Sequence, residues 1–433
     1  MDMDYYEAMK YINRTGKFGS KLGLDRINRL LYYMGNPHHK LRVIHVAGTN
    51  GKGSVVSIIS SILIEAGYKV GIYTSPYLQR FTERIKINNE EISKDDIARL
   101  INYIGPIVDK VISEGYDNPT EFEIITAIMF KYFSDKQVDF VALEVGLGGR
   151  LDSTNVINPL VSVITSISYD HLGILGNTLS QIAYEKAGII KQNGIVVSYP
   201  QEEEALKVIE DVCKERNAKL ILVSQYNTYI SKYSHKGQTF NLSINDKSYV
   251  DLKTSLLGEY QILNIKTSIQ AIEALKYRGI DIKDEYIYKG IENAKWPGRI
   301  EVMGENPKIV LDGAHNVQGM AELKKAILKY FKYDKIILVI GVLRDKEYEK
   351  MCSIIMPIAD TVITTKPDSE RALSSEELGG VANKYNDSVI ISSSILDAYN
   401  TSIESAKEDD LIVFCGSLYM IGRVRDIIQK HML

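Results

Sequence analysis

The sequence predicts an α/β protein of two domains, each built around a mostly parallel β-sheet. The chain has 433 residues, which is too long for one ordinary domain and suits two. Short apolar runs typical of buried strands alternate with helical stretches, and this order favours a parallel sheet covered on both faces. The alternation starts again after KWPGR at 295–299, a sequence typical of a hinge. We therefore expect a first domain over 1–297 and a second over 298–433.

Composition excludes several classes of protein. Hydrophobic residues make up 45% and charged residues 25%, as in a globular protein with a real core, and the net charge of −3 gives no basic field for nucleic acid. Cys213, Cys352 and Cys415 have neither disulfide nor metal-ligand spacing, which favours a reducing compartment. The acidic N-terminus lacks an apolar signal core, and no apolar run reaches the length of about 18 residues that a membrane span needs. We expect a cytoplasmic monomer without nucleic-acid or membrane partners.

The first domain begins with an amphipathic helix and a buried strand. Residues 24–34 place apolar side chains at helical spacing, and the run Val43 to Ala47 reads as a strand. That strand leads into the glycine-rich sequence GTNGKGS at 48–54, and a helical pattern follows from Val55 to Glu65. A strand, a glycine-rich loop and a helix in this order are what a phosphate-binding loop needs.

Further elements complete a first domain of the P-loop ATPase type. We expect helices over Asp95 to Tyr103 and Glu123 to Phe133, and buried strands over Val138 to Val145 and Val161 to Ser166. Residues 218–257 differ, because they are rich in Tyr, Ser, Thr and Asn and contain short alternating runs such as FNLSI. This composition predicts a small β-rich insert.

The second domain repeats the strand–helix alternation. Each of its apolar runs is followed by a helix-like segment, and the runs are KIVLD, KIILVIG, TVITT, SVIIS and LIVFCG. This pattern predicts a Rossmann-like, doubly wound sheet.

The glycine-rich loop carries the first candidate site. Gly51 and Gly53 accept backbone dihedrals that turn N–H groups toward phosphate oxygens, and the start of the next helix adds partial positive charge. Lys52 would lie along the β- and γ-phosphates, and Ser54 would reach a magnesium ion. Val46 replaces the first glycine of the commonest phosphate-loop motif, so a chance glycine-rich turn is the alternative. We expect ATP and Mg²⁺ here, although the loop alone does not define a reaction.

Two further residues follow the carboxyl ends of predicted strands. Glu144 ends one strand, and His171 lies just past the next. Ligands of open α/β sheets bind at this edge, so both residues should approach the loop. A carboxylate suits Mg²⁺, which prefers oxygen ligands, whereas histidine is less usual and is often a structural residue.

Four other polar residues lie at or near the ends of predicted elements, and two of them have ordinary structural explanations. Lys186 lies near the end of a helical stretch, where a lysine is usually solvated, and Asn264 opens a helical stretch, where it would act as a cap. Arg299 lies at the hinge, and Asp312 ends the strand KIVLD before the polar turn GAHN. The sequence alone leaves their roles open.

Long motifs resemble one known family. In chain order they are GTNGKGS, TSPYLQRFTERIKIN (74–88), TEFE (120–123), LEVGLGGRLDSTN (143–155), SYDHLGILGNTLSQIAYEKAGIIK (168–191), PGR (297–299) and DGAHN (312–316). Together they resemble the folylpolyglutamate synthase and dihydrofolate synthase family of the Mur ligase superfamily, over nearly the whole chain. The chain departs from the family at Tyr260, where histidine is common, and at Val317, where proline is common.

The resemblance implies roles for individual residues. It implies an ATP-binding domain of the Mur ligase central type, a C-terminal glutamate ligase domain, and a carbamylated lysine at Lys186. The implied ATP contacts are Gly51, Lys52, Gly53, Ser54, Asn264, Arg299 and Asp312. The implied magnesium ligands are Ser75, Glu144 and His171. The implied folate or pterin side of the cleft is formed by Thr120, Glu121, Phe122, Glu123, Leu151, Asp152 and Ser153.

The expected reaction activates a carboxylate. Transfer of the γ-phosphate from ATP makes an acyl phosphate, and the amine of glutamate then displaces phosphate. Lys52, Lys186 and Arg299 are the catalytic candidates, and His315 would position the incoming amino acid or would simply be a polar turn residue. The small-molecule substrates would be ATP, L-glutamate and either a folate or dihydropteroate, and the sequence does not decide between these acceptors.

Three other interpretations remain. A nucleotide-dependent switch would hydrolyse ATP without glutamate, and a scaffold would not need Lys52, Glu144 and His171. A peptidoglycan-precursor ligase would carry a further N-terminal domain, for which the stretch before Gly48 is too short.

Overall fold

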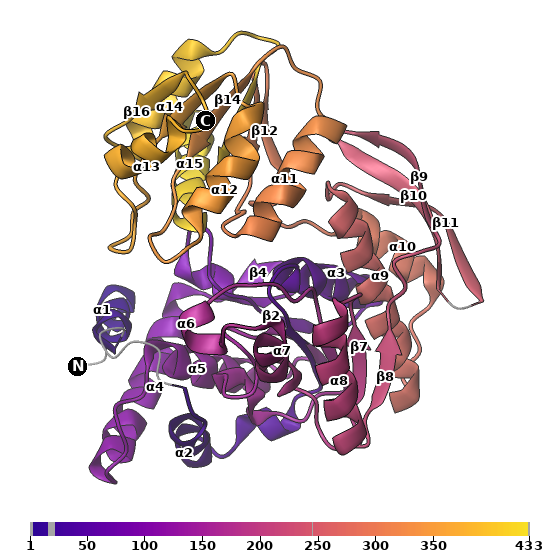
Figure 1. Ribbon diagram of the computed structural model, residues 1–433. Coiled ribbons are helices and arrows are strands. Elements are labelled where there is room, and N and C mark those ends of the chain that lie inside the picture. Colours follow the sequence, from indigo (N-terminus) through magenta and orange to yellow (C-terminus); the bar gives the residue numbers. More distant parts are fainter. Residues whose placement is uncertain (1–2, 16–21, 245, 432–433) are drawn as a thin grey trace. The chain divides into compact units, whose positions relative to one another are not determined.

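The structure is a computed structural model that describes residues 3–15, 22–244 and 246–431. The chain forms two compact units (Figure 1). The first consists of Met1–Asn227 and Leu263–Asn293, and the second of Thr228–Ile262 and Ala294–Leu433. The chain passes from one unit to the other three times. The second crossing falls inside the helix α9 (Glu259–Ala274), which starts in the second unit and continues in the first.

The first unit is built on an eight-stranded sheet with the order β4-β3-β2-β5-β1-β6-β7-β8. Its strands are β1 (Val43–Ala47), β2 (Val70–Tyr73), β3 (Ile85–Ile87), β4 (Glu90–Glu91), β5 (Phe140–Glu144), β6 (Val161–Ile164), β7 (Ile195–Ser198) and β8 (Lys219–Leu222). All neighbours pair in parallel except at the β2–β3–β4 edge. The predicted parallel sheet is therefore confirmed, with β1 at its centre.

Helices cover both faces of this sheet. They are α1 (Tyr5–Thr15), α2 (Asp25–Tyr33), α3 (Lys52–Glu65), α4 (Lys94–Ser113), α5 (Glu121–Asp135), α6 (Leu172–Leu175), α7 (Leu179–Ala187), α8 (Glu203–Glu215), α9 and α10 (Asp284–Asn293). Short 3₁₀ helices occur at Pro37–Lys40, Phe81–Arg84, Ser153–Val156 and Leu275–Arg278. The starts of α4 and α5 follow from sequence, because the side chains of Ser93 and Thr120 accept hydrogen bonds from the first turn.

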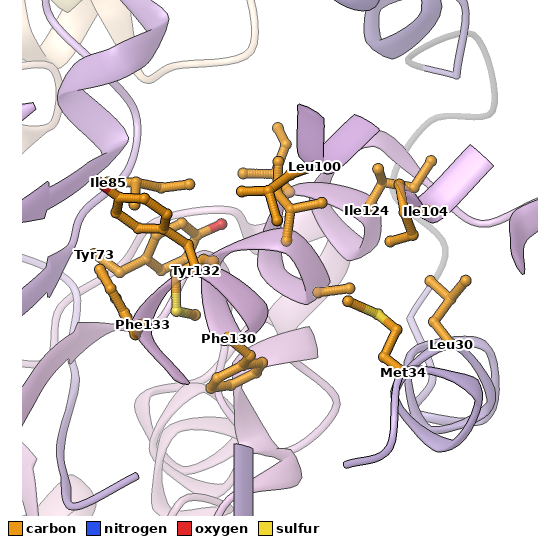
Figure 2. Close-up of a cluster of buried hydrophobic side chains, with 14 of the residues drawn as sticks. Leu30, Met34, Tyr73, Ile85, Leu100, Ile104, Ile124, Phe130, Tyr132 and Phe133 are labelled. Atoms are coloured by element: carbon orange, nitrogen blue, oxygen red, sulfur yellow. The ribbon is translucent and has the colours of Figure 1, made fainter. Parts of the chain in front are cut away.

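Apolar cores lie between the sheet and these helices. In one core, α2, α4 and α5 pack together, and Figure 2 shows Leu30, Leu100, Phe130 and Phe133 among its buried side chains. The other core contains residues of α7 and α8 and of the strands β6 and β7. A sheet buried on both faces needs strands without alternating exposed residues, which explains why all five residues of β1 are buried.

The second unit contains a six-stranded sheet with the order β12-β13-β17-β14-β15-β16. Its strands are β12 (Glu301–Glu305), β13 (Lys308–Leu311), β14 (Ile336–Ile340), β15 (Thr361–Thr364), β16 (Val389–Ile391) and β17 (Leu411–Cys415). The helices that follow them are α11 (Val317–Tyr330), α12 (Tyr348–Ile355), α13 (Ser375–Ala382), α14 (Ile395–Ser405) and α15 (Leu418–His431), and a 3₁₀ turn occupies Met356–Ile358 (Figure 1). Every predicted strand of this unit is present, and the sequence missed only the antiparallel edge strand β12.

The β-rich segment has two parts. Residues Lys219–Leu222 form β8, the last strand of the large sheet, rather than part of an insert. The strands β9 (Thr228–Ser234), β10 (Gly237–Ile244) and β11 (Lys247–Thr254) form a separate antiparallel sheet. This sheet packs within the second unit, where the Tyr330 hydroxyl donates to Gln238 Oε1 at 2.8 Å, whereas the sequence placed it in the first domain.

Among the described residues, we find no helix that is long and apolar enough to cross a membrane.

Candidate active site

The loop between β1 and α3 depends on two glycines. Gly48 and Gly51 have φ values of +153° and +89°, in the region that favours glycine. A Cβ atom on Gly48 would lie 1.8 Å from Thr165 Oγ1, and one on Gly51 would lie 2.7 Å from Asn264 Oδ1. Asn264 lies inside α9, which begins at Glu259, so the suggestion that it caps a helix is wrong. Its buried side chain instead faces the phosphate loop.

The loop is anchored on the segment that follows β6. Thr49 N–H donates to Ser166 O at 2.8 Å, and Ser168 N–H donates to Thr49 Oγ1 at 3.1 Å. The helix α3 begins at Lys52 and has no side-chain cap. Its first N–H groups therefore point out of the helix end with partial positive charge, which suits a phosphate.

Two lysines converge on one carbonyl of this loop. Lys52 Nζ donates to Gly48 O and Thr49 O, at 3.1 Å each, and Lys186 Nζ donates to Gly48 O at 2.8 Å. Lys186 is only 3% exposed, so the expectation of a solvated lysine is wrong. Burial, followed by the charge of Lys52, lowers the pKa of Lys186 to about 7. The side chain is therefore close to the balance between amine and ammonium at neutral pH.

Glu144 and Ser75 meet at the carboxyl edge of the sheet. Glu144 ends β5 and is 5% exposed, and it pairs in register with Val46 of β1. Ser75 follows the neighbouring strand β2, and its N–H donates to Glu144 Oε2 at 3.2 Å. A carboxylate and a hydroxyl beside a phosphate loop fit Mg²⁺, which takes oxygen ligands from few protein groups and completes its shell with water and phosphate.

The structure places His171 on the loop after β6. It has a left-handed backbone (φ 52°), and its side chain is 36% exposed. Its backbone N–H donates to Asp170 Oδ1 at 2.9 Å. The charge of Asp170 acts on Lys186, so this loop lies near the two lysines. No group of three His, Cys, Asp or Glu side chains in the described parts of the chain is placed to hold a metal ion. Metal binding by His171 stays a prediction.

The TEFE segment starts α5 with a capping box. Glu123 Oε2 accepts from Thr120 N at 2.7 Å and pairs with Arg26 Nε at 3.0 Å, so these polar groups hold the helix start in place. Phe122 packs over Gly146, where a Cβ atom would lie 2.4 Å from the Phe122 ring. The ring of Phe122 therefore lies beside the segment that follows Glu144, with Glu121 half-buried next to it.

Asp152 organises the loop that follows β5. It is 4% exposed, and its carboxylate accepts from Leu147 N at 2.8 Å and from Thr154 N at 3.0 Å. Burial raises the pKa of Asp152. Its neighbours Leu151 and Ser153 are half-buried and buried, respectively, and contact with a substrate by any of the three stays a prediction.

Sequence reasoning missed a buried polar chain behind this loop. Thr154 Oγ1 donates to Asp152 Oδ1 at 2.5 Å and lies 2.8 Å from Nε2 of His45, which is fully buried in β1. Burial lowers the pKa of His45 to about 3, so this imidazole is neutral. The available signal was a histidine in the middle of the apolar run VIHVA.

The second unit has its own polar turn after β13. Asp312 is 3% exposed, and its carboxylate accepts from Ile300 N at 2.9 Å and Ala314 N at 2.8 Å. Burial raises the pKa of Asp312, and the charge of Arg299 opposes this shift. His315 Nδ1 lies 2.7 Å from Gly313 O. Arg299 covers Gly313, where a Cβ atom would lie 2.0 Å from its Nη1.

Known proteins match the chain over its whole length. Residues 46–272 match the Mur ligase middle domain, and residues 298–418 match the Mur ligase glutamate ligase domain. The chain is 40% identical to the dihydrofolate synthase/folylpolyglutamate synthase of Bacillus subtilis, over 97% of this chain and 98% of that protein. The Mycobacterium tuberculosis folylpolyglutamate synthase complexed with ADP and AMPPCP has a TM-score of 0.91 at 29% identity, over 98% and 99% of the chains. Escherichia coli FolC in complex with DHPP and ADP has a TM-score of 0.88 at 28% identity, over 100% of both.

Proposed function

The chain belongs to the Mur ligase family, among the dihydrofolate synthases/folylpolyglutamate synthases, and from this premise we propose which reaction it performs. It is an ATP-dependent ligase. We propose that it adds L-glutamate to tetrahydrofolyl glutamates, and that the same site adds glutamate to 7,8-dihydropteroate to give dihydrofolate.

One arrangement carries this proposal. The Gly48 carbonyl receives both Lys52 and Lys186, at an uncapped helix start. The Lys52 ammonium beside such a helix start forms a site for a polyphosphate. Support comes from similar proteins of known structure, which were solved with ADP and AMPPCP, and with DHPP and ADP.

The chain's residues would divide the work as follows. Lys52 exchanges its two loop carbonyls for the β- and γ-phosphates and neutralises the phosphoryl group during transfer to the acceptor carboxylate. Backbone N–H groups of Gly51, Gly53 and Ser54 bind the phosphates of ATP. Asn264, which lies in α9, holds this loop in place. The resulting acyl phosphate has a good leaving group, so the amine of glutamate can displace it.

Mg²⁺ would be held by Glu144 and Ser75, with His171 as the third proposed ligand. When bound, it would neutralise phosphate charge and orient the β- and γ-phosphates. Lys186 is suited to carbamylation, because its amine is buried and has a pKa of about 7. The carbamate would turn a cation at the loop into an anion that orients the metal or its water.

In the second unit, we propose that Arg299 and Asp312 contact ATP and that His315 positions glutamate. Asp312 keeps the turn rigid through its two backbone hydrogen bonds, which leaves His315 at the exposed side of the turn. We also propose that the sequence divides into an ATP-binding domain over 1–297 and a glutamate ligase domain over 298–433, with Thr228–Ile262 packing in the second compact unit. We further propose a monomer acting in the cytoplasm, and light scattering on the purified protein tests the monomer.

The first test is ADP release by the purified protein with Mg-ATP and glutamate. The acceptors are dihydropteroate, tetrahydrofolate monoglutamate and none. ADP that forms only when glutamate and an acceptor are both present supports the ligase and identifies its substrate. ADP that forms without an acceptor contradicts the proposal and favours a nucleotide-dependent switch.

A further inference from the structure

Arg84 is a half-buried cation that pairs with no carboxylate among the described residues. It ends the 3₁₀ helix Phe81–Arg84, before β3. Its Nε is buried and has no hydrogen-bond partner, and no ion pair joins its guanidinium to any residue in the described parts of the chain. Burying an unpaired cation costs free energy, so such a group is expected where a ligand supplies the missing charge.

The acids of the same segment are already engaged. Glu83 accepts hydrogen bonds from Leu78 N at 2.8 Å and Arg80 N at 2.9 Å. Glu91 pairs with Arg80 at 2.7 Å and accepts from the Thr82 hydroxyl at 2.5 Å. The arginine nearer to solvent, Arg80, therefore has a partner within the protein, and the less exposed Arg84 does not.

Aromatic rings hold the Arg84 guanidinium. Its Cζ lies 5.2 Å from the ring centre of Tyr77 and 5.9 Å from that of Phe81. The Arg84 carbonyl accepts from Thr74 N at 3.1 Å. This bond fixes the Arg84 backbone beside Thr74, the residue before Ser75. A planar cation stacked in this way is preorganised for a carboxylate, which it can bind through two parallel N–H groups.

The surroundings of Tyr73 relate Arg84 to the proposed acceptor residues. Tyr73 pairs with Ile85, the residue after Arg84, across β2 and β3, and Figure 2 shows both side chains. Burial raises the pKa of Tyr73, and the charges of Arg84, Asp152 and Glu121 all act on its hydroxyl. The Tyr73 ring also lies 6.1 Å from that of Phe122. Arg84 is thus near three of the residues proposed for the acceptor cleft.

We propose that Arg84 binds the acceptor carboxylate that does not react, and so selects glutamylated folates over dihydropteroate. This inference rests on the proposed function. Dihydropteroate has one carboxylate, which must be activated. A tetrahydrofolyl glutamate has two on its terminal residue, so one is free to pair with a guanidinium while the other reacts. Arg84 is then a substrate-specificity residue.

The experiment compares Arg84→Gln with Arg84→Lys and with the matched control Arg80→Gln. Loss of a charged hydrogen-bonded pair of this kind corresponds to about 10- to 100-fold in kcat/KM. We expect Arg84→Gln to lose about that factor on tetrahydrofolate monoglutamate, mainly through KM, and to stay within about twofold of wild type on dihydropteroate. Arg84→Lys should recover part of the loss, because lysine keeps the positive charge but lacks the two parallel N–H donors of the guanidinium. Arg80→Gln should behave as wild type.

A substrate analogue isolates the carboxylate itself. Replacing the glutamate of tetrahydrofolate by 4-aminobutyrate keeps the reacting carboxylate and removes the other one. Wild type should lose about 10-fold or more on this analogue, whereas Arg84→Gln should treat it like the normal substrate, since the two changes remove the same interaction.

Several outcomes overturn the inference. Equal losses on tetrahydrofolate and dihydropteroate would make Arg84 a general structural residue. No loss on either acceptor, additive losses with the analogue, or a wild type that uses dihydropteroate alone would also overturn it. Failure of the proposed function is seen separately, as wild-type ADP release that needs neither glutamate nor an acceptor.

Discussion

Each unit contains a turn that leads from a buried parallel strand into a helix, and the two turns are built differently. Between β1 and α3 the turn is held by glycine geometry and by two lysines on the Gly48 carbonyl, and the helix start has no side-chain cap. Between β13 and α11 the turn is held by the Asp312 carboxylate, and Asn316 caps the helix by accepting from Gly319 N at 2.8 Å.

The difference shows which helix start is prepared for phosphate. The N–H groups of α3 have a cation beside them and no competing side chain, whereas one of those of α11 is already bonded to Asn316 and an acid precedes the turn. An anion is favoured at the first and opposed at the second. The same strand–turn–helix unit therefore gives a helix start suited to phosphate in one case and a rigid turn in the other.

The substitution with the largest expected effect on the difference between the two turns is Lys52→Ala. If the first turn binds the transferred phosphoryl group, kcat should fall by about 1000-fold, equivalent to roughly 4 kcal/mol in the barrier. The melting temperature should stay near that of wild type, because Lys52 bonds only two carbonyls of a loop. Lys325→Ala, an exposed lysine of the helix after the second turn, is the control and should keep full activity. Residual turnover of Lys52→Ala within about tenfold of wild type would contradict the assignment.

The sequence predicted the strand before each turn, because VIHVA and KIVLD are short, mostly apolar runs that lead directly into glycine-containing turns. It did not predict β2, β3, β4, β7 or β12, and it assigned β8 to the β-rich insert. The strands β2 and β7 are fully buried but only four residues long, whereas β4, β8 and β12 have exposed or half-buried side chains and so lack the signature of a buried strand. It also misjudged Lys186 and Asn264. Their burial depends on contacts with Gly48 and Gly51, which are remote in the chain, so no local pattern could have shown it.

A second prediction concerns Lys186 in the first turn and the pH dependence of the free energy of unfolding. Its folded-state pKa of about 7 lies below the usual 10.5, so between these values the unfolded chain binds a proton that the folded chain does not. Stability then rises with pH relative to Lys186→Met, by about 2 kcal/mol between pH 7.5 and 9.5. Urea titrations of both proteins in carbonate-free buffer measure this difference. A pH-independent difference would mean that Lys186 stays protonated when folded.

A third prediction weakens the second turn. In Asp312→Asn, an amide replaces a carboxylate that accepts two backbone N–H groups, so one N–H of Ile300 or Ala314 loses its acceptor. We expect a loss of about 1–2 kcal/mol in the free energy of unfolding. Asp312→Ala, which removes both acceptors, should lose more. Equal stability of Asp312→Asn and wild type would show that the carboxylate does not hold the turn.

The smallest expected effect is the loss of the cap in Asn316→Ala. It removes the acceptor for Gly319 N and should cost about 1 kcal/mol of stability, whereas Asn316→Gly should cost only a few tenths, since glycine is tolerated at this position. Both variants should bind ADP as wild type does, because uncapping α11 does not remove the acid that precedes it. Urea midpoints and ADP titrations measure the two properties on the same samples. Tighter ADP binding by Asn316→Ala would mean that the cap alone had kept phosphate from the start of α11. The contrast between the two turns would then rest on one side chain.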